Sequence, residues 1–242
     1  MEDKKIRIGK AAEILGMSVQ TLRNWEKTGK LLPQRSQGWQ RYYFLQDLER
    51  FALDLEKLGL AWAASAQPPE IPTDYYCEQQ ARFMSRLEKM GLLLAHADTV
   101  GEKAASLLTT VAGEIGDNSF MHNIGSWPDI PGIFFAYDIG KRVIVLADRG
   151  QGVRKTLSRV RPNIKTDVEA LRVAFTEIVS GREPEKRGNG LKVVRRIIEL
   201  NPIYLLFRSG VAAVKSPKKQ SGSITIAAMS ENVRGAYAII KF

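Results

Sequence analysis

The sequence predicts an α+β protein made of two folded parts separated by a linker. Apolar side chains recur at helical spacing through residues 1–60, whereas residues 101–242 mix helical segments with runs of β-branched and aromatic residues. Between them, residues 61–73 contain three prolines and several small residues, and proline cannot continue a helix because it lacks a backbone donor. We therefore expect an all-helical N-terminal domain over 1–60, a linker over 61–73, a connecting helix over 74–100 and a mixed domain over 101–242.

The composition is that of a folded protein with a basic surface. The 242 residues include 36 Lys and Arg against 26 Asp and Glu, which gives a formal net charge of +10. This charge suits a polyanionic partner, although simple solubility explains it equally well. Cys77 cannot form an internal disulfide, no apolar run reaches the length of a membrane helix, and residues 1–5 lack the features of a signal peptide. A cytoplasmic protein without a membrane partner is expected.

Two short helices joined by a tight turn are expected near the N-terminus. Apolar residues at helical spacing cover positions 8–15, Gly16 interrupts them, and Ser18 offers a side-chain oxygen that can cap the next helix. In that second helix Leu22 and Trp25 share one apolar face. The two helices are therefore predicted to form a helix-turn-helix. Its other face presents residue types that reach base edges and phosphates: Gln20, Thr21, Arg23, Asn24 and Lys27.

The residues that follow make this motif more specific. Gly29-Lys30-Leu31-Leu32-Pro33 forms a turn after the second helix, and Arg35, Arg41 and Tyr43 fall in the next segment. This order resembles the MerR family, in which a Thr-Leu-Arg helix is followed by a Gly-Leu-x-Pro turn, an arginine-containing wing and a further helix. The resemblance covers residues 8–51 and implies a winged helix-turn-helix domain that binds double-stranded DNA, with phosphate contacts from the three wing residues.

Two departures from that family limit what the resemblance implies. The aromatic residue that usually precedes the wing arginine is replaced by Gln40, with Trp39 one place earlier. Asn24-Trp25 stands where two tyrosines are common, which is closer to excisionase-like relatives of the same winged fold. DNA binding is therefore a safer expectation than promoter activation by DNA distortion. Two roles are open for Arg23: it contacts a DNA base, or it stabilises the domain by contacts within the fold.

A polar ridge is expected on a helix early in the second domain. Glu114, Asn118 and His122 are four residues apart, so a helix stacks them along one side, with Val111 and Ile115 beside them facing the core. A carboxylate and an amide one turn apart can share a water molecule and a metal ion. A plain polar helix face is the ordinary explanation for this spacing alone.

Two glycine motifs follow the ridge in the sequence. The first, Asp148-x-Gly150-x-Gly152, ends an expected hairpin that turns at residues 138–141, and its glycines let the backbone approach a ligand closely. Alone it is a weak signal, because turns use the same residues. The second, Arg187-Gly188-Asn189-Gly190-Leu191, opens a helical segment, which is an arrangement that binds phosphate.

The order of ridge, first glycine motif and second glycine motif resembles the GHKL (Bergerat-fold) ATPases over roughly residues 101–242. This resemblance implies an α/β sandwich with a lid between the two glycine motifs. Closing strands are expected over residues 203–207, 223–229 and 236–242, with a turn at 208–210.

The same resemblance implies that the domain binds ATP and Mg²⁺. By it, Asn118 is the Mg²⁺ ligand, Glu114 is the general base and Asp148 accepts a hydrogen bond from the adenine amino group. The implied ATP-binding residues are Asn118, His122, Asp148, Gly150, Gly152, Arg187, Gly188, Gly190, Leu191 and Ser223.

Two functions from different classes fit this organisation. In the first, the protein is a DNA-binding transcription regulator whose DNA or partner binding is controlled by ATP. In the second, the C-terminal domain is a Mg-dependent ATPase or protein kinase of the anti-sigma-factor type that acts on a partner protein, and the N-terminal domain only localises it. Glu114 allows hydrolysis but does not prove it. His96 lacks the sequence context of a phosphoacceptor, so histidine autophosphorylation is not expected.

A homodimer is also expected, because one winged domain covers only a short half-site of DNA. Two copies would read half-sites about one helical turn, ~10 bp, apart. The helix from Asp74 to His96 is the element expected to join them, with Tyr75, Phe83 and Leu87 as contacts.

Overall fold

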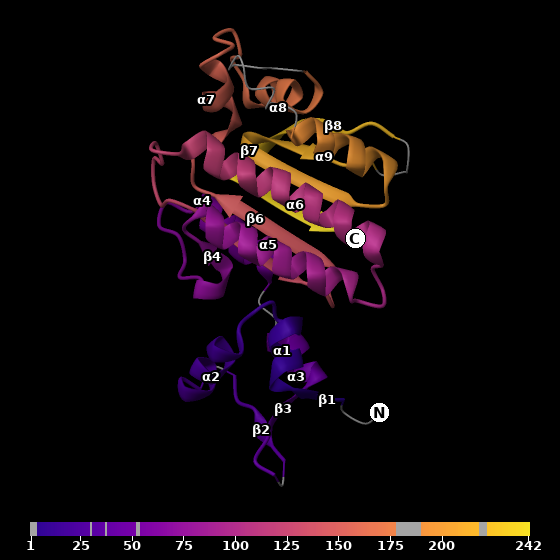
Figure 1. The fold of residues 1–242 in the computed structure, drawn as a ribbon. Helices are drawn as coiled ribbons and strands as arrows, with labels where there is room; N and C mark the ends of the chain where they lie inside the picture. The colour runs from indigo at the N-terminus through magenta and orange to yellow at the C-terminus, as the bar shows by residue number, and fades with distance from the viewer. Residues whose placement is uncertain (1–3, 30, 37, 52–53, 178–189, 218–221) are drawn as a thin grey trace.

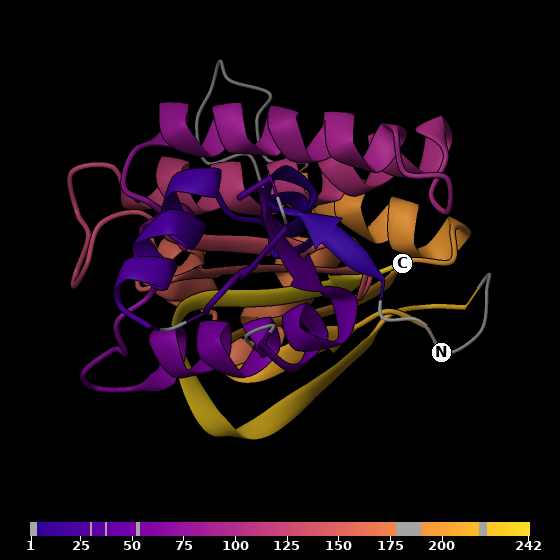
Figure 2. The same ribbon diagram turned by 90° about the horizontal axis from the view of Figure 1, so that it is seen from below.

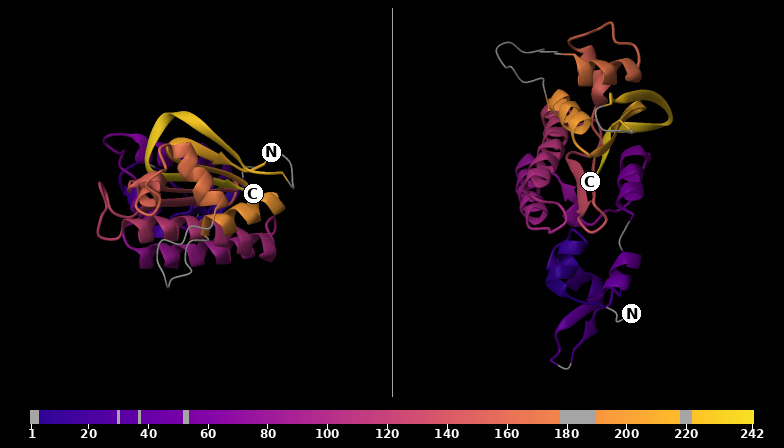
Figure 3. Two further views of the ribbon diagram at one scale, coloured as in Figure 1. Left: turned by 90° about the horizontal axis from the view of Figure 1, so that it is seen from above. Right: turned by 90° about the vertical axis from the view of Figure 1, so that its right-hand side faces the viewer.

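The computed structural model describes residues 4–29, 31–36, 38–51, 54–177, 190–217 and 222–242 (Figure 1). These residues form two lobes stacked end to end (Figures 1 and 3). The N-terminal lobe is built from the described residues up to 51, and the C-terminal lobe from those that start at 54.

The N-terminal lobe combines three helices with a small sheet. Its elements are β1 (Lys5–Arg7), α1 (Ile8–Ile14), α2 (Val19–Lys27), β2 (Gln34–Arg35), β3 (Arg41–Phe44) and α3 (Leu45–Phe51). The strands pair antiparallel in the order β1-β3-β2, with Ile6 opposite Tyr43. The helix-turn-helix is present, but the expectation of an all-helical domain is wrong, because the ladder between β1 and β3 completes the core by burying Ile6 and Tyr43.

The described part of the C-terminal lobe is built on a five-stranded antiparallel sheet in the order β4-β5-β6-β8-β7. Its strands are β4 (Tyr76–Cys77), β5 (Ile133–Asp138), β6 (Val143–Asp148), β7 (Tyr204–Lys215) and β8 (Thr225–Lys241). Its helices are α4 (Leu55–Ala64), α5 (Gln80–Ala95), α6 (Glu102–Asn123), α7 (Gly152–Ser158), α8 (Asp167–Thr176) and α9 (Gly190–Leu200). Helices α5, α6 and α9 cover one face of the sheet, and α4 covers the other (Figures 2 and 3). The α+β class is therefore confirmed.

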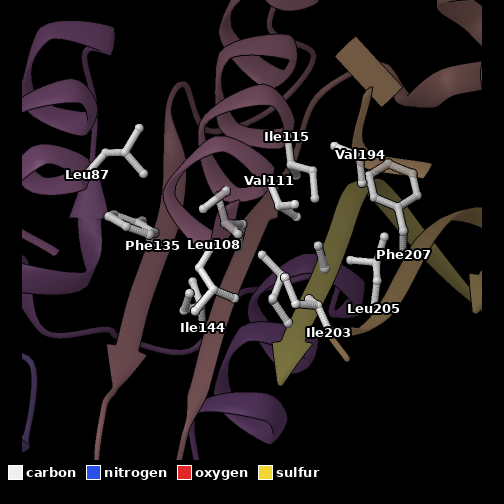
Figure 4. Packing of buried hydrophobic residues seen from close by; sticks show 14 of the residues in the cluster. Leu87, Leu108, Val111, Ile115, Phe135, Ile144, Val194, Ile203, Leu205 and Phe207 are labelled. Atoms are coloured by element: carbon white, nitrogen blue, oxygen red, sulfur yellow. The ribbon is translucent and has the colours of Figure 1, made fainter. Parts of the chain in front are cut away.

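Two apolar clusters lie on opposite faces of the sheet. One fills the space between the sheet and α5, α6 and α9, where Leu108 and Val111 of α6 lie near Ile144 of β6 (Figure 4). The other continues from α4 across the opposite face into the N-terminal lobe, so that Trp62 and Leu15 belong to one cluster. Burying an apolar side chain of this size stabilises a fold by about 1.5–3 kcal/mol. The second cluster therefore holds the two lobes together.

Helix α4 belongs to the C-terminal lobe and overlaps the expected linker. Residues 61–64 are helical, because the prolines of this segment begin only at Pro68. Gly59 lets α4 approach the sheet, since a Cβ there would lie 2.7 Å from the Val145 side chain. Because α4 packs on the sheet of the C-terminal lobe, that lobe includes the residues from Leu55 onward and does not begin after residue 61.

Residues 74–100 do not form the single connecting helix that the sequence pattern favours. A 3-10 turn and strand β4 come first, and α5 begins only at Gln80. The three side chains expected at a dimer interface lie inside the chain, since Tyr75, Phe83 and Leu87 are 1%, 0% and 5% exposed. These apolar residues pack on their own sheet and on α6, so they cannot contact a second copy.

The C-terminal strands are longer than expected. Residues 223–229 and 236–242 fall largely within one strand, β8, and residues 208–210 lie within β7 instead of forming a turn. Register shifts on either side of Gly210 mark a bulge, where the backbone has a φ of +59°. The bulge brings Gly210 against the Asp167 carboxylate at the start of α8.

Candidate functional site

Helix α6 carries the polar ridge, and the start of α9 lies against it. Glu114 and Asn118 are partly buried, and His122 is exposed one turn later. A Cβ at Gly190, the first residue of α9, would lie 3.2 Å from Asn118 Nδ2 and closer still to a carboxylate oxygen of Glu114. The ridge therefore contacts Gly190, the first described residue of the second glycine motif. N-terminal amides of a helix attract anions, and carboxylate and amide oxygens suit hard cations.

The buried carboxylate of Asp148 lies beside the same helix, at the end of β6. Ser119 Oγ donates a hydrogen bond to it over 2.7 Å, and the backbone N–H of Gly150 donates over 2.8 Å. The backbone N–H of Ala236 is a further donor. Burial raises the pKa of Asp148 to about 6, although these donors favour the ionised form. Above that pH the carboxylate is an ionised acceptor next to the ridge.

The loop of the first glycine motif is held between α6 and the bulge of β7. Gly150 packs on the side chain of Asn123, whose Oδ1 accepts from Gln151 N over 2.8 Å. Gly152 has a φ of +75°, a backbone conformation that residues with a side chain rarely adopt. The backbone N–H of Val153, the next residue, donates to Ser209 Oγ over 3.0 Å. The glycines are thus required by the geometry of the loop itself, even without a ligand.

Three polar residues of this site were not identified from the sequence. Ser119 and Asn123 extend the polar side of α6 toward the first glycine motif, and their spacing of four residues is a signal that could have revealed them. Ser209 had no such signal. It lies on a strand remote in sequence and reaches the loop only through the pairing of β7 with β8.

Ser223 does not join the other expected ATP-binding residues. It is exposed, and the amide of Ile224 donates to Glu199 Oε1 over 3.2 Å at the C-terminal end of α9. Gly190 is at the opposite end of that helix, roughly 14 Å away at a rise of 1.5 Å per residue. Ser223 therefore lies far from Gly190, and its phosphate contact stays a prediction.

Two more of the expected residues take different positions around the site. Leu191 is half-buried and packs on the apolar cluster between the sheet and α5, α6 and α9. His122 contributes its backbone carbonyl, which accepts from Gln151 Nε2 over 3.3 Å. Arg187 and Gly188 lie outside the described residues, as does the part of the expected lid from residue 178 onward.

Arg149 connects the first glycine motif to α4. It is fully buried, at 0% exposed, and its Nε donates to Asp129 over 2.8 Å. Its Nη1 donates to the carbonyls of Trp62 and Ser65, and its Nη2 donates to that of Ala66 over 3.2 Å. A buried guanidinium needs such partners, and a cation suits the carbonyl end of a helix. No local pattern in the sequence distinguishes this residue from the rest of the motif.

Helix α2 presents a polar surface on the N-terminal lobe. Ser18 caps it as expected, since its Oγ accepts from Thr21 N over 3.0 Å. Thr21 departs from the expected DNA surface, because its hydroxyl donates to Asp74 of the C-terminal lobe. The members of the expected set that are exposed on α2 are Gln20, Arg23, Asn24 and Lys27.

Glu26 joins the wing to α2. Its oxygens accept from Arg41 Nε and Arg35 Nη2, each over 2.6 Å, and these hydrogen bonds, Arg41 first, hold the pKa of Glu26 below its usual value. Each guanidinium keeps further N–H groups that can reach phosphates. Tyr43 is only 2% exposed and packs with Ile6 in the core. Tyr43 therefore lies in the core of the lobe and not on the exposed surface of the wing, and its phosphate contact stays a prediction.

Comparison with family models matches residues 7–43 to the MerR family regulatory protein. No curated protein matches the chain. The match spans α1, α2 and the wing strands, so the N-terminal lobe contains a MerR-like helix-turn-helix, which indicates a DNA-binding transcription regulator. Within the described ranges, none of the helices has the length and apolar character needed to cross a membrane.

Replacing Asp148 with asparagine is expected to stabilise the unliganded protein at neutral pH. Burial raises this pKa from 3.8 to about 6. The wild-type fold therefore loses stability as the pH rises through that interval, by roughly 3 kcal/mol. Asparagine can accept from Gly150 and donate to Ser119 without a charge. Urea unfolding across this pH range should give a flatter profile for Asp148→Asn, and a variant less stable than wild type at neutral pH would contradict the assignment.

Proposed function

We propose that the protein is a transcription regulator that binds double-stranded DNA through its N-terminal lobe and ATP through its C-terminal lobe. ATP controls its binding to DNA or to a partner protein. The MerR-like helix-turn-helix supports the first activity. The observations that support the second are the approach of Gly190 to Glu114 and Asn118 of α6 and the hydrogen bond from Ser119 of the same helix to Asp148.

Each part of a Mg-nucleotide has a matching group in this proposal. Asp148 accepts from the adenine amino group. The amides at the start of α9 take phosphate oxygens, and Gly150 and Gly152 let the loop backbone approach the nucleotide closely. Asn118 holds Mg²⁺ together with phosphate and water oxygens, and the ion supplies neutralisation of phosphate charge. Glu114, one turn from Asn118, is the base for an attacking water.

Control of DNA binding by ATP is supported by the contacts of Arg149. Its backbone belongs to the loop that would contact the nucleotide, and its side chain holds the carbonyls at the end of α4. Helix α4 follows the N-terminal lobe in the chain and packs in the cluster that both lobes share. A displacement of this loop on nucleotide binding would therefore displace the helix next to the DNA-binding lobe.

The alternative function is that of an ATPase or protein kinase acting on a partner protein, with the N-terminal lobe only localising it. The partly buried carboxylate of Glu114 beside Asn118 favours this reading, because a binding-only site has no need of a base. The two proposed functions differ in whether ATP turnover depends on DNA or on a partner protein.

Asp148→Asn is expected to weaken Mg-ATP binding about tenfold or more. The new amide sets a donor against the adenine amino group, at a cost of ~1–3 kcal/mol. Calorimetric titration with Mg-ATP measures this, with Glu88→Gln on the exposed side of α5 as a control for the charge change. Because Asp148→Asn is expected to be the more stable protein, its loss of affinity cannot be assigned to unfolding. Equal affinities in wild type and Asp148→Asn would remove Asp148 from the nucleotide site.

Glu114→Gln is expected to bind Mg-ATP with little change but to lose turnover by ~10²–10⁴-fold, the usual contribution of a general base. Phosphate release is measured with and without duplex DNA, and Glu102→Gln at the exposed start of the same helix is the control. Turnover that ignores DNA and transfers phosphate to a partner favours the alternative function. No turnover above background in wild type would make the lobe a nucleotide-binding switch.

Arg41→Ala is expected to weaken binding to all duplexes similarly and to lower the salt slope by about one, as loss of a phosphate contact does. Asn24→Ala should instead relax sequence preference, since Asn24 is exposed on α2. Titrations at several salt concentrations distinguish the two effects, and Lys89→Ala on α5 controls for net charge. DNA binding without any salt dependence would contradict this use of the winged domain.

A further inference from the structure

The turn between α1 and α2 is buried against the C-terminal lobe. Leu15 and Met17 are buried, and Gly16 between them has a φ of +64°. A Cβ at Gly16 would collide with the carbonyl oxygen of Tyr137 on β5. The turn that sets the angle between the two helices therefore lies directly against the sheet of the other lobe.

Asp74 fixes the first turn of α2 from the C-terminal lobe. One of its carboxylate oxygens, Oδ2, accepts from the backbone N–H of Ser18 over 2.9 Å and from the hydroxyl of Thr21. Ser18 is the N-cap of α2, so Asp74 adds a second acceptor where the helix has unpaired donors and a positive dipole end. The helix that carries the exposed polar surface is thus held at its N-terminus by a residue of the other lobe.

The position of Asp74 is itself determined by the C-terminal lobe. The next residue, Tyr75, is almost fully buried, and its ring lies 5.7 Å from that of Phe134 on β5. The Tyr75 hydroxyl donates to the carbonyl of Leu15 over 3.1 Å. Asp74 and Tyr75 thus hold the turn and the start of α2 together, and their own place is set by the sheet.

We propose that Asp74 is a positioning residue for DNA recognition, which acts through Thr21 and Ser18 to set the orientation of α2. This proposal rests on DNA binding by the N-terminal lobe. Base readout needs side chains held to within about half an ångström, and a nine-residue helix that loses its anchor can tilt by more than that. Phosphate contacts from the wing depend less directly on this anchor, because β2 and β3 are held by their own pairing and by the ladder of β3 with β1.

The test uses the full-length chain and two duplexes, one selected by the wild-type protein from a random pool and one unrelated duplex of equal length. Asp74→Ala removes the acceptor and is expected to reduce the preference for the selected duplex about tenfold, the effect of losing one base contact. Its affinity for the unrelated duplex and its salt slope should match those of Glu70→Ala, which makes the same charge change at an exposed position in the same segment.

Variants of Thr21 distinguish positioning from a structural effect or a direct DNA contact. Thr21→Val removes the hydroxyl donor and should lose preference like Asp74→Ala, whereas Thr21→Ser keeps the donor and should retain it. The double variant Asp74→Ala/Thr21→Val should be no worse than Asp74→Ala alone, because the alanine variant already lacks the acceptor of the Thr21 hydroxyl. Additive losses would mean that Thr21 contacts DNA itself and would overturn the proposal.

Two further outcomes separate this proposal from the proposed function. Wild-type preference in Asp74→Ala and Thr21→Val would overturn the positioning role while leaving DNA binding intact. Absence of salt-dependent binding by the wild-type protein to both duplexes would overturn DNA binding and the positioning role together.

Discussion

The buried guanidinium of Arg149 is the constraint on which the arrangement of the larger lobe depends. Its donors have no access to water, so acceptors inside the fold must meet them. The carbonyls at the end of α4 and the carboxylate of Asp129 do so. The loop after β6, the end of α4 and the segment before β5 are thereby fixed to one another. Asp148 and Gly150, on either side of Arg149, are held against α6 as a consequence.

The two lobes are joined at two places that share one sheet. Helix α4 packs on the sheet in the apolar cluster that includes the N-terminal lobe, and the turn before α2 contacts Tyr137 of β5 at Gly16 and Asp74 at Ser18. Packed elements of this kind move as units and do not deform continuously. For ATP to control DNA binding, it therefore has to shift α4 or release the turn, and both contacts can be altered by single substitutions without touching the nucleotide or the DNA.

Local signals predicted local structure well. The Ser18 cap, the apolar face of α2, the long helix α6 and the hairpin of β5 and β6 all formed where their patterns indicated. The predictions failed where the sequence pattern allowed a side chain more than one packing partner. Phe83 suited a dimer surface by its apolar character, but α6 and the sheet of the same chain cover it. An apolar face looks identical in sequence whether its partner is its own chain or a second copy. Dimerisation, ATP and Mg²⁺ stay predictions.

The sequence by itself determined the periodicities, the caps and the glycines, because each depends on neighbours within a few residues along the chain. It also determined the order of the ridge and the two glycine motifs. Only the tertiary structure decided that Gly190 meets Glu114 and Asn118, that Ser223 lies at the far end of α9, and that Thr21 faces Asp74. These pairings depend on which strands of the sheet are neighbours and how the helices pack on them. That choice follows from burying the apolar surface of the whole chain at once, which no local pattern records.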